Sequence, residues 1–214
     1  MSIVRPEFGP TLPELAGPRL RALPVAARVV LAILAALVVL AVLWALLLRG
    51  GNKNEHVVLV RRPIAFNFLE RAPLHKQAPR AGELARVSGR GLSAAVRELR
   101  LPPYRGDSAG QLPVLASLVE ARMGRTLPGF LWRSESRANY NTFQGYEIVY
   151  QYHGAHGLTY GRRIFLLPEP TARQGVDITV EAPRSAAVVK ADDVGHNGAL
   201  KTALRSFRFG TERP

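Results

Sequence analysis

The chain has 214 residues, no cysteine, and a formal net charge of +13 from 29 basic and 16 acidic residues. Without cysteine it cannot hold a disulfide framework, a thiolate metal site, a cysteine nucleophile or a lipid anchor on cysteine. Its mean hydropathy is +0.02, which in so charged a chain indicates that one apolar segment is averaged with a polar remainder.

The apolar segment lies near the N-terminus. Residues 29–48 contain no charged side chain, and at 1.5 Å per residue they would form a helix of about 30 Å, the thickness of the hydrocarbon core of a bilayer. The segment is longer than the apolar part of a signal peptide, and no small-residue cleavage site follows it. We therefore expect an uncleaved single transmembrane helix over residues 25–48, between a Pro-rich disordered stub at 1–24 and a tether at 49–55.

The span could have either of two orientations in the membrane. Basic residues flank both of its ends, so the positive-inside rule is nearly balanced. A short basic stub followed by a large domain is typical of a signal anchor, which would place the C-terminal domain outside the cell membrane. The alternative is a cytoplasm-facing domain that binds nucleic acid or anionic lipid through its basic half.

Residues 56–210 have the length of one ordinary domain, followed by a tail at 211–214. In chain order the pattern predicts strands, a Pro- and Gly-rich loop, a strand, an amphipathic helix closed by Gly124, three alternating strands and a helix capped by Asn197. The corresponding ranges are 57–60, 64–69, 71–91, 96–101, 111–123, 145–153, 158–167, 176–180 and 197–206. This order predicts an α+β fold with a mainly antiparallel sheet covered by helices.

Three segments carry a resemblance to a known family. They are PGFLWRSESRANYNTFQGYEIVYQY at 128–152, YGRRIFLL at 160–167 and the closing helix ALKTALRSFRFG at 199–210. Together with the central helix they resemble the PsbP-like, LpqN-type α/β/α sandwich domain of membrane-anchored actinobacterial proteins, over residues 56–210. The resemblance implies an accessory or binding domain on a membrane-associated assembly, and it implies no active site.

Much of the positive charge falls in one stretch. Residues 56–105 contain ten basic residues against three glutamates, a net charge of +7. We interpret the ten as a possible contact surface for an acidic partner, anionic lipid or phosphate: Arg61, Arg62, Arg71, Lys76, Arg80, Arg86, Arg90, Arg97, Arg100 and Arg105. The alternative is a compositional bias of the genome, because a GC-rich genome encodes chains that are rich in Arg and Ala but poor in Lys.

Candidate chemistry is sparse. The sequence has no nucleophile elbow, phosphate-binding loop or zinc-protease motif. His153 and His156 could share a metal with His196, but a zinc site needs three or four converging ligands, and the Gly-flanked pair is typical of a hairpin loop. Asp192 and Asp193 are better explained by the helix that follows them than by acid–base chemistry. We therefore expect no enzyme activity, no metal and no cofactor.

The tyrosines of residues 146–152 allow two interpretations. Tyr146, Tyr150 and Tyr152 lie on one face of one strand, where they would pack in the core or at its edge. With nearby arginines they could instead form a stacking platform for nucleic acid or glycan. Arg162 and Arg163 are adjacent in a strand, so they should point to opposite faces. The sequence as a whole predicts a single-pass membrane-anchored accessory protein whose basic extracytoplasmic domain binds a partner protein or envelope component.

Overall fold

A computed structural model of the chain describes residues 24–49, 55–155 and 157–212. The chain divides into two compact units, Met1–Lys53 and Asn54–Pro214. The predicted stub at 1–24 and tether at 49–55 fall almost wholly outside the described residues.

The described part of the first unit is one helix, α2 (Val25–Arg49). Its side chains are described at 25–27, 29–30 and 33–42. The large apolar side chains described between Val29 and Val42 are each more than half exposed. Within the residues so described, no helix reaches the length and apolar character needed to cross a membrane.

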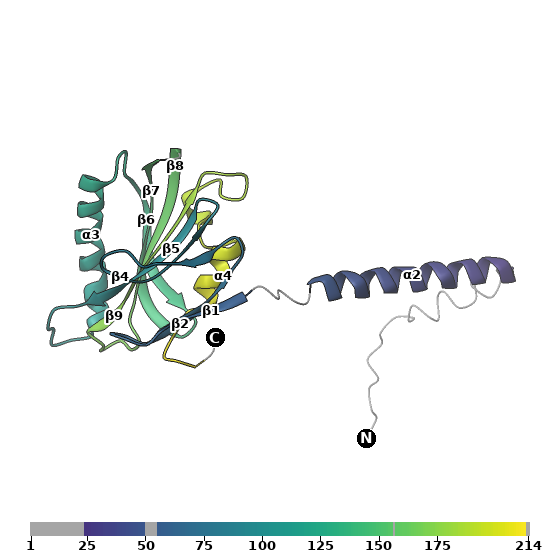
Figure 1. Cartoon of the computed structure of the whole chain (residues 1–214), viewed down its shortest axis with the longest axis horizontal. Coiled ribbons are helices and arrows are strands. Elements are labelled where there is room, and N and C mark those ends of the chain that lie inside the picture. Colours follow the sequence, from purple (N-terminus) through teal and green to yellow (C-terminus); the bar gives the residue numbers. More distant parts are fainter. Residues whose placement is uncertain (1–23, 50–54, 156, 213–214) are drawn as a thin grey trace, which may run out of the picture. The chain divides into compact units, whose positions relative to one another are not determined.

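The second unit is built on a seven-stranded sheet with strand order β3-β4-β5-β9-β8-β7-β6, in which every neighbouring pair is antiparallel. Helix α3 lies on one side of this sheet and helix α4 on the other (Figure 1). The strands are β3 (His75–Gln77), β4 (Glu83–Gly89), β5 (Leu92–Arg100), β6 (Leu131–Tyr140), β7 (Phe143–Gly154), β8 (Gly157–Leu166) and β9 (Gln174–Pro183). The helices are α3 (Leu112–Thr126) and α4 (Gly198–Ser206).

The larger core lies on the α4 side of the sheet. Strand alternation in β9 turns Val176, Ile178 and Val180 to this side, where each is at most 3% exposed. A second, three-stranded sheet in the order β1-β2-β10 and α4 cover these residues. Phe66 stacks on Phe207 with 5.5 Å between ring centroids, which joins the small sheet to the end of α4. Its strands are β1 (Glu55–Val60), β2 (Phe66–Arg71) and β10 (Arg208–Phe209).

The smaller core lies between the sheet and α3. The helix buries its predicted apolar face, including Leu112, Ala116 and Met123, against the large side chains Ile148 and Phe165. Two short 3-10 helices, η1 (Ser108–Gln111) and η2 (Ala191–Asp193), precede α3 and α4 respectively. The predicted α+β fold, with a mainly antiparallel sheet between helices, is therefore confirmed.

Two local predictions are wrong. The stretch 71–91, predicted as loop, contains β3 and β4, because its prolines lie outside the strands while Ala85 and Val87 alternate into the core. Helix α3 does not end at Gly124 but continues to Thr126. Asn197 does precede α4, although its side chain makes no capping hydrogen bond.

Candidate functional site

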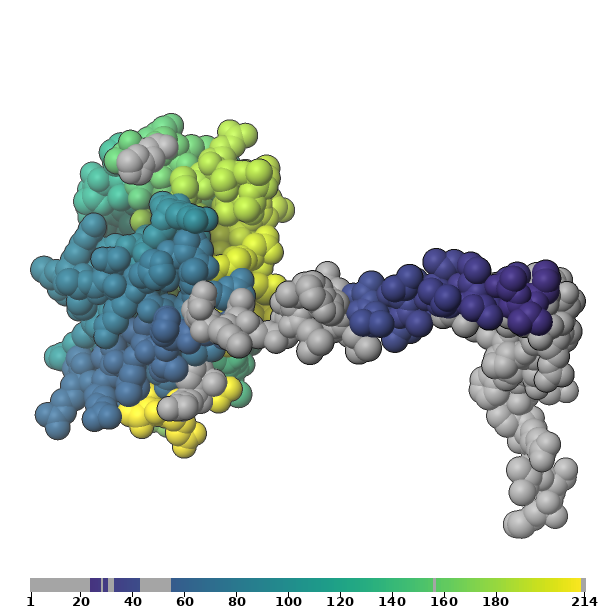
Figure 2. Space-filling view, turned by 45° about the vertical axis from the view of Figure 1, so that its right-hand side comes forward, coloured from purple at the N-terminus to yellow at the C-terminus, as the bar shows by residue number. Residues whose placement is uncertain are grey.

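The ten predicted contact residues are distributed over several elements. The segment that carries them, coloured blue to teal in Figure 2, forms a large part of the face shown there. Three of the ten, Arg80, Arg86 and Arg97, line one cleft beside α3. The remaining seven lie in the β1–β2 turn (Arg61, Arg62), at the end of β2 (Arg71), on β3 (Lys76), in the β4–β5 turn (Arg90), at the end of β5 (Arg100) and in the loop before η1 (Arg105).

Strand register assembles the floor of this cleft, which we call the arginine cleft. Arg86 on β4 lies opposite Ala95 on β5, and the same row continues through Thr179 on β9 to Arg163 on β8. Directly opposed residues of an antiparallel sheet point to the same face. Two arginines that are far apart in the sequence therefore face the same space, and Arg122 from α3 lines its wall.

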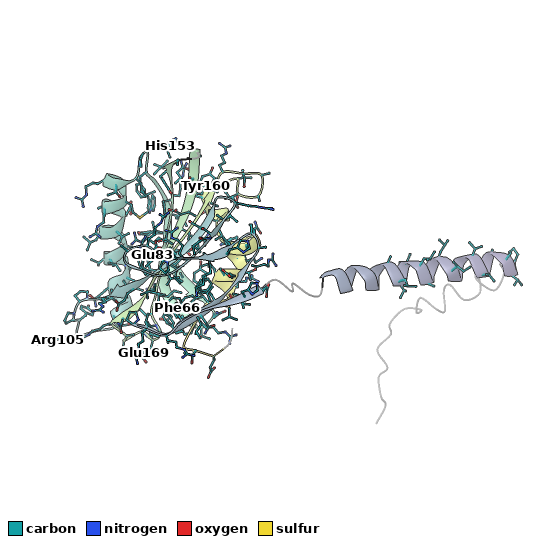
Figure 3. The ribbon with its side chains drawn as sticks, viewed as in Figure 1. Phe66, Glu83, Arg105, His153, Tyr160 and Glu169 are labelled. Carbon is teal, nitrogen blue, oxygen red and sulfur yellow. The ribbon has the colours of Figure 1, made fainter. Side chains whose placement is uncertain are left out.

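A buried glutamate fixes the arginines that enter the cleft from β4 and β5. The Glu83 side chain is 1% exposed and accepts hydrogen bonds from Arg86 Nε at 2.8 Å and from Arg97 at 3.2 Å. It also accepts one from the backbone N–H of Arg80 at 3.0 Å. The hydrogen bond from Arg86, more than any other interaction, lowers the pKa of Glu83 to about 2. Glu83, labelled in Figure 3, thus remains ionised and holds two guanidinium groups in place.

The third paired arginine is Arg163. Its Nε lies 2.9 Å from Asp177 Oδ1 in an ion pair on the α3 side of the sheet. The neighbouring Arg162 points to the other side, where it pairs with Glu147 at 3.2 Å. The predicted opposite orientations of these two residues are confirmed.

The arginine cleft is also lined by a tyrosine whose side chain crosses a strand. Tyr150 on β7, Gly161 on β8 and Glu181 on β9 form one row of the register. A Cβ at Gly161 would lie 2.2 Å from the Tyr150 ring, so only glycine lets the ring pass over β8. The Tyr150 hydroxyl then reaches Glu181 at 3.1 Å. Burial, reinforced by Glu181, raises the Tyr150 pKa well above its ordinary value.

The arginine cleft has an excess of positive charge. Its volume is about 250 Å³, and five arginines line it. Glu83, Asp177 and Glu181 are the carboxylates that contact or line it, which leaves two positive charges unbalanced. Arg80 and Arg122 are exposed and form no ion pair within residues 55–155 and 157–212. The cleft also contains the Thr179 hydroxyl, which is buried and has no hydrogen-bond partner among the described atoms. Fixed guanidinium groups of this kind can bind carboxylate or phosphate.

The other residues singled out from the sequence lie elsewhere. His153 is exposed at one end of the domain, at the end of β7 (Figure 3), while His156 lies outside the described residues. In the part of the chain that the structure describes, no three His, Asp or Glu residues converge as metal ligands do. Asp193 accepts backbone hydrogen bonds from Val189 and Lys190, so it stabilises the turn at η2 and not the start of α4.

The tyrosines of β7 pack against the α3-side core. Tyr150 is 1% exposed, and Tyr152 stacks on it with 6.2 Å between ring centroids. Tyr146 is half-buried against the same core. The predicted packing role is confirmed.

Comparisons with known proteins give similarity of structure alone. No family model matches the sequence, and no curated protein matches it. Among solved structures, the fold is similar to PsbP (CyanoP) from the cyanobacterium Synechocystis sp. PCC 6803, with 10% identity, a TM-score of 0.49, and coverage of 75% of this chain and 95% of that one. It is also similar to LpqN of Mycobacterium tuberculosis, described as involved in cell envelope biogenesis, with 13% identity, a TM-score of 0.39, and coverage of 76% and 87%. Both kinds of protein that the sequence resembles are therefore among the matched structures, and no function is transferred from them to this chain.

Proposed function

We propose that this chain is a single-pass membrane-anchored accessory protein whose C-terminal domain lies outside the cell membrane and binds an acidic segment of a partner protein in the arginine cleft. The observation on which this proposal rests is the cleft itself, in which fixed and free guanidinium groups face one open space. The role is one of binding and not of catalysis.

Membrane anchoring is supported by the sequence and exposure of α2. Residues 29–48 are uncharged, and the large apolar side chains described between Val29 and Val42 are more than half exposed. Exposure of so many apolar side chains to water costs about 25 cal/mol per Å². Lipid would remove that cost, and the short basic stub before the helix favours export of the domain that follows it.

An acidic protein segment suits the arginine cleft better than a nucleic acid does. The cleft is short, and its lining combines guanidinium groups with the apolar side chains of Met123 and Leu127. Nucleic acid binding relies on a longer basic track that follows many phosphates. A few carboxylates on one peptide segment would instead neutralise the two unbalanced charges, and Arg binds carboxylate with two parallel hydrogen bonds.

Site-specific crosslinking in living cells tests this proposal. A photo-crosslinking amino acid at Thr126, which is exposed and lines the cleft, should give one adduct whose crosslinked peptide is acidic. The paired change Arg80→Gln/Arg122→Gln should reduce the adduct about tenfold, because it removes the two unpaired cations.

The matched control is Arg90→Gln/Arg105→Gln, which removes the same charge from exposed positions outside the cleft. This control should keep the adduct within about twofold of the unchanged chain. An adduct that survives the cleft substitutions, or one whose crosslinked peptide is neutral or basic, would contradict the proposal.

A further inference from the structure

A second basic site lies on the opposite side of the seven-stranded sheet. It is a groove of about 680 Å³ between β6 and α4, and we call it the basic groove. Glu147 on β7 and Arg162 on β8 line it, Ala138 and Tyr140 lie on its β6 side, and Lys201 and Arg205 lie on its α4 side. Because it faces away from α3, it shares no lining residue with the arginine cleft.

The groove contains an arginine that is buried in the sheet. Arg162 is 4% exposed. Its two terminal nitrogens donate to Glu147 at 3.2 Å and to the carbonyl oxygen of Asp192 at 2.8 Å. Its Nε is buried and has no partner among the described residues. A buried guanidinium with an unused donor is costly, and its positive charge is therefore only partly compensated by the protein.

Glu147 is the carboxylate of the groove, and other residues already donate hydrogen bonds to it. Besides Arg162 it accepts hydrogen bonds from the hydroxyls of Tyr140, at 3.1 Å, and Ser136, at 3.3 Å. Burial, followed by the charge of Glu147, raises the Tyr140 pKa to about 12, so the phenol remains a neutral donor to Glu147. Glu147 is thus committed to Arg162 and its hydroxyl donors.

Two further cations lie beside this ion pair. Lys201 and Arg205 are four residues apart and project from the same face of α4. Neither forms an ion pair within residues 55–155 and 157–212. Arg137 on β6 is paired in register with Tyr146, so its side chain points to the α3 side of the sheet. A structural ion pair alone would leave the groove neutral, whereas here three cations and one carboxylate leave two positive charges.

The size and lining of the groove indicate the class of ligand. A volume of about 680 Å³ is that of a small-molecule site and exceeds what a simple ion needs. The amide of Asn141 and the ring of His196 add polar groups, and the apolar contribution of Ala138 and Leu204 is small. Polar groups around two unbalanced positive charges match a phosphate attached to a polyhydroxy body.

We propose that the basic groove binds a phosphate-bearing polar molecule, with its phosphate held by Lys201 and Arg205 beside Arg162 and its polyhydroxy part against Asn141 and His196. Such a molecule can be a soluble organophosphate or the headgroup of a phospholipid. Binding here is independent of partner capture in the arginine cleft.

Calorimetric titration of the full chain in a neutral detergent tests the inference. The probes are inorganic phosphate, glycerol 1-phosphate, and phosphatidylglycerol in mixed micelles. The dissociation constant for glycerol 1-phosphate or for phosphatidylglycerol should rise about tenfold in Lys201→Gln/Arg205→Gln. It should change less than about twofold in Arg90→Gln/Arg105→Gln, which removes the same charge elsewhere.

The source of the ligand follows from which probe responds. A response to glycerol 1-phosphate assigns a soluble organophosphate, and a response to phosphatidylglycerol alone assigns a lipid headgroup. An equal loss of affinity in both double variants would show that the binding is only general charge attraction, and it would overturn the inference. So would a lack of binding to all three probes, or binding of inorganic phosphate alone. Because the arginine cleft is intact in Lys201→Gln/Arg205→Gln, the Thr126 crosslink should persist in that variant, which separates failure of this inference from failure of the proposed function.

Discussion

Glu83 determines how the arginine cleft is held together at the level of single residues. Its carboxylate receives two hydrogen bonds from Arg86, at 2.8 Å each, one from Arg97 and one from the backbone N–H of Arg80. Arg97 is 39% exposed, so its charge stays available to a ligand, whereas the Glu83 side chain is 1% exposed. The cleft therefore presents guanidinium groups whose orientation is set before any partner arrives.

The ionisation of Glu83 makes a testable prediction about stability. Its folded pKa of about 2 lies below the ordinary value of 4.5. A depressed carboxyl pKa contributes stability that is present above the unfolded pKa and is lost as pH falls through the folded value. The free energy of unfolding should therefore decline between about pH 4.5 and pH 2, and Glu83→Gln should lower it at pH 7 by on the order of 2 kcal/mol. Urea unfolding of the full chain in neutral detergent, followed by circular dichroism, measures both effects.

The matched control is Glu98→Gln. Glu98 also pairs with an arginine, Arg100, at 2.7 Å, but the Arg100 side chain is 70% exposed. Surface pairs of this kind contribute less than about 1 kcal/mol. Equal destabilisation by the two substitutions, or an unchanged acid profile in Glu83→Gln, would show that Glu83 does not organise the cleft.

Among the elements, those with an apolar period were predictable. Strand β9 alternates apolar and polar residues, and α3 repeats its apolar residues at helical spacing, so both were expected close to their observed bounds. Strand β6 has no such period, because it is an edge strand in which Ala138 is the buried residue, and backbone pairing to β7 is what holds it. Strand β4 was not predicted because it is short, alternates its apolar residues with Arg86 and Ser88, and lies among Gly and Pro residues.

Helix α4 supplies the prediction at this scale. Leu200 is 3% exposed in the core between α4 and the seven-stranded sheet, while Leu118 on the outer face of α3 is 66% exposed. Leu200→Ala should therefore lower the free energy of unfolding by about 2–5 kcal/mol. Leu118→Ala should change it by less than about 0.5 kcal/mol. Similar losses in both variants, measured by the same urea unfolding, would contradict the assignment of the core.

For the whole molecule, the sequence could predict the excess of positive charge but not where it converges. Arg80, Arg86 and Arg97 were expected as part of one basic surface, but Arg122 and Arg163 come from other parts of the chain. The strand register that places Arg163 in the same row as Arg86 is a long-range property. The alternation of Arg162 and Arg163 was the local signal that each side of the sheet receives one arginine.

The membrane anchor and the outward-facing domain are the central claim about the molecule as a whole. The absence of cysteine from the sequence makes the claim directly testable, because a single introduced cysteine is the only thiol to label. Ala155 is exposed in the β7–β8 hairpin, so a cysteine there should be accessible without disturbing the core. A matched Ser2→Cys variant reports on the other side of the proposed span.

Whole cells that produce either variant are treated with a membrane-impermeant maleimide, before and after lysis. The account predicts that Ala155→Cys is labelled in intact cells and that Ser2→Cys is labelled only after lysis. Labelling of Ala155→Cys only after lysis would place the domain in the cytoplasm and contradict the account.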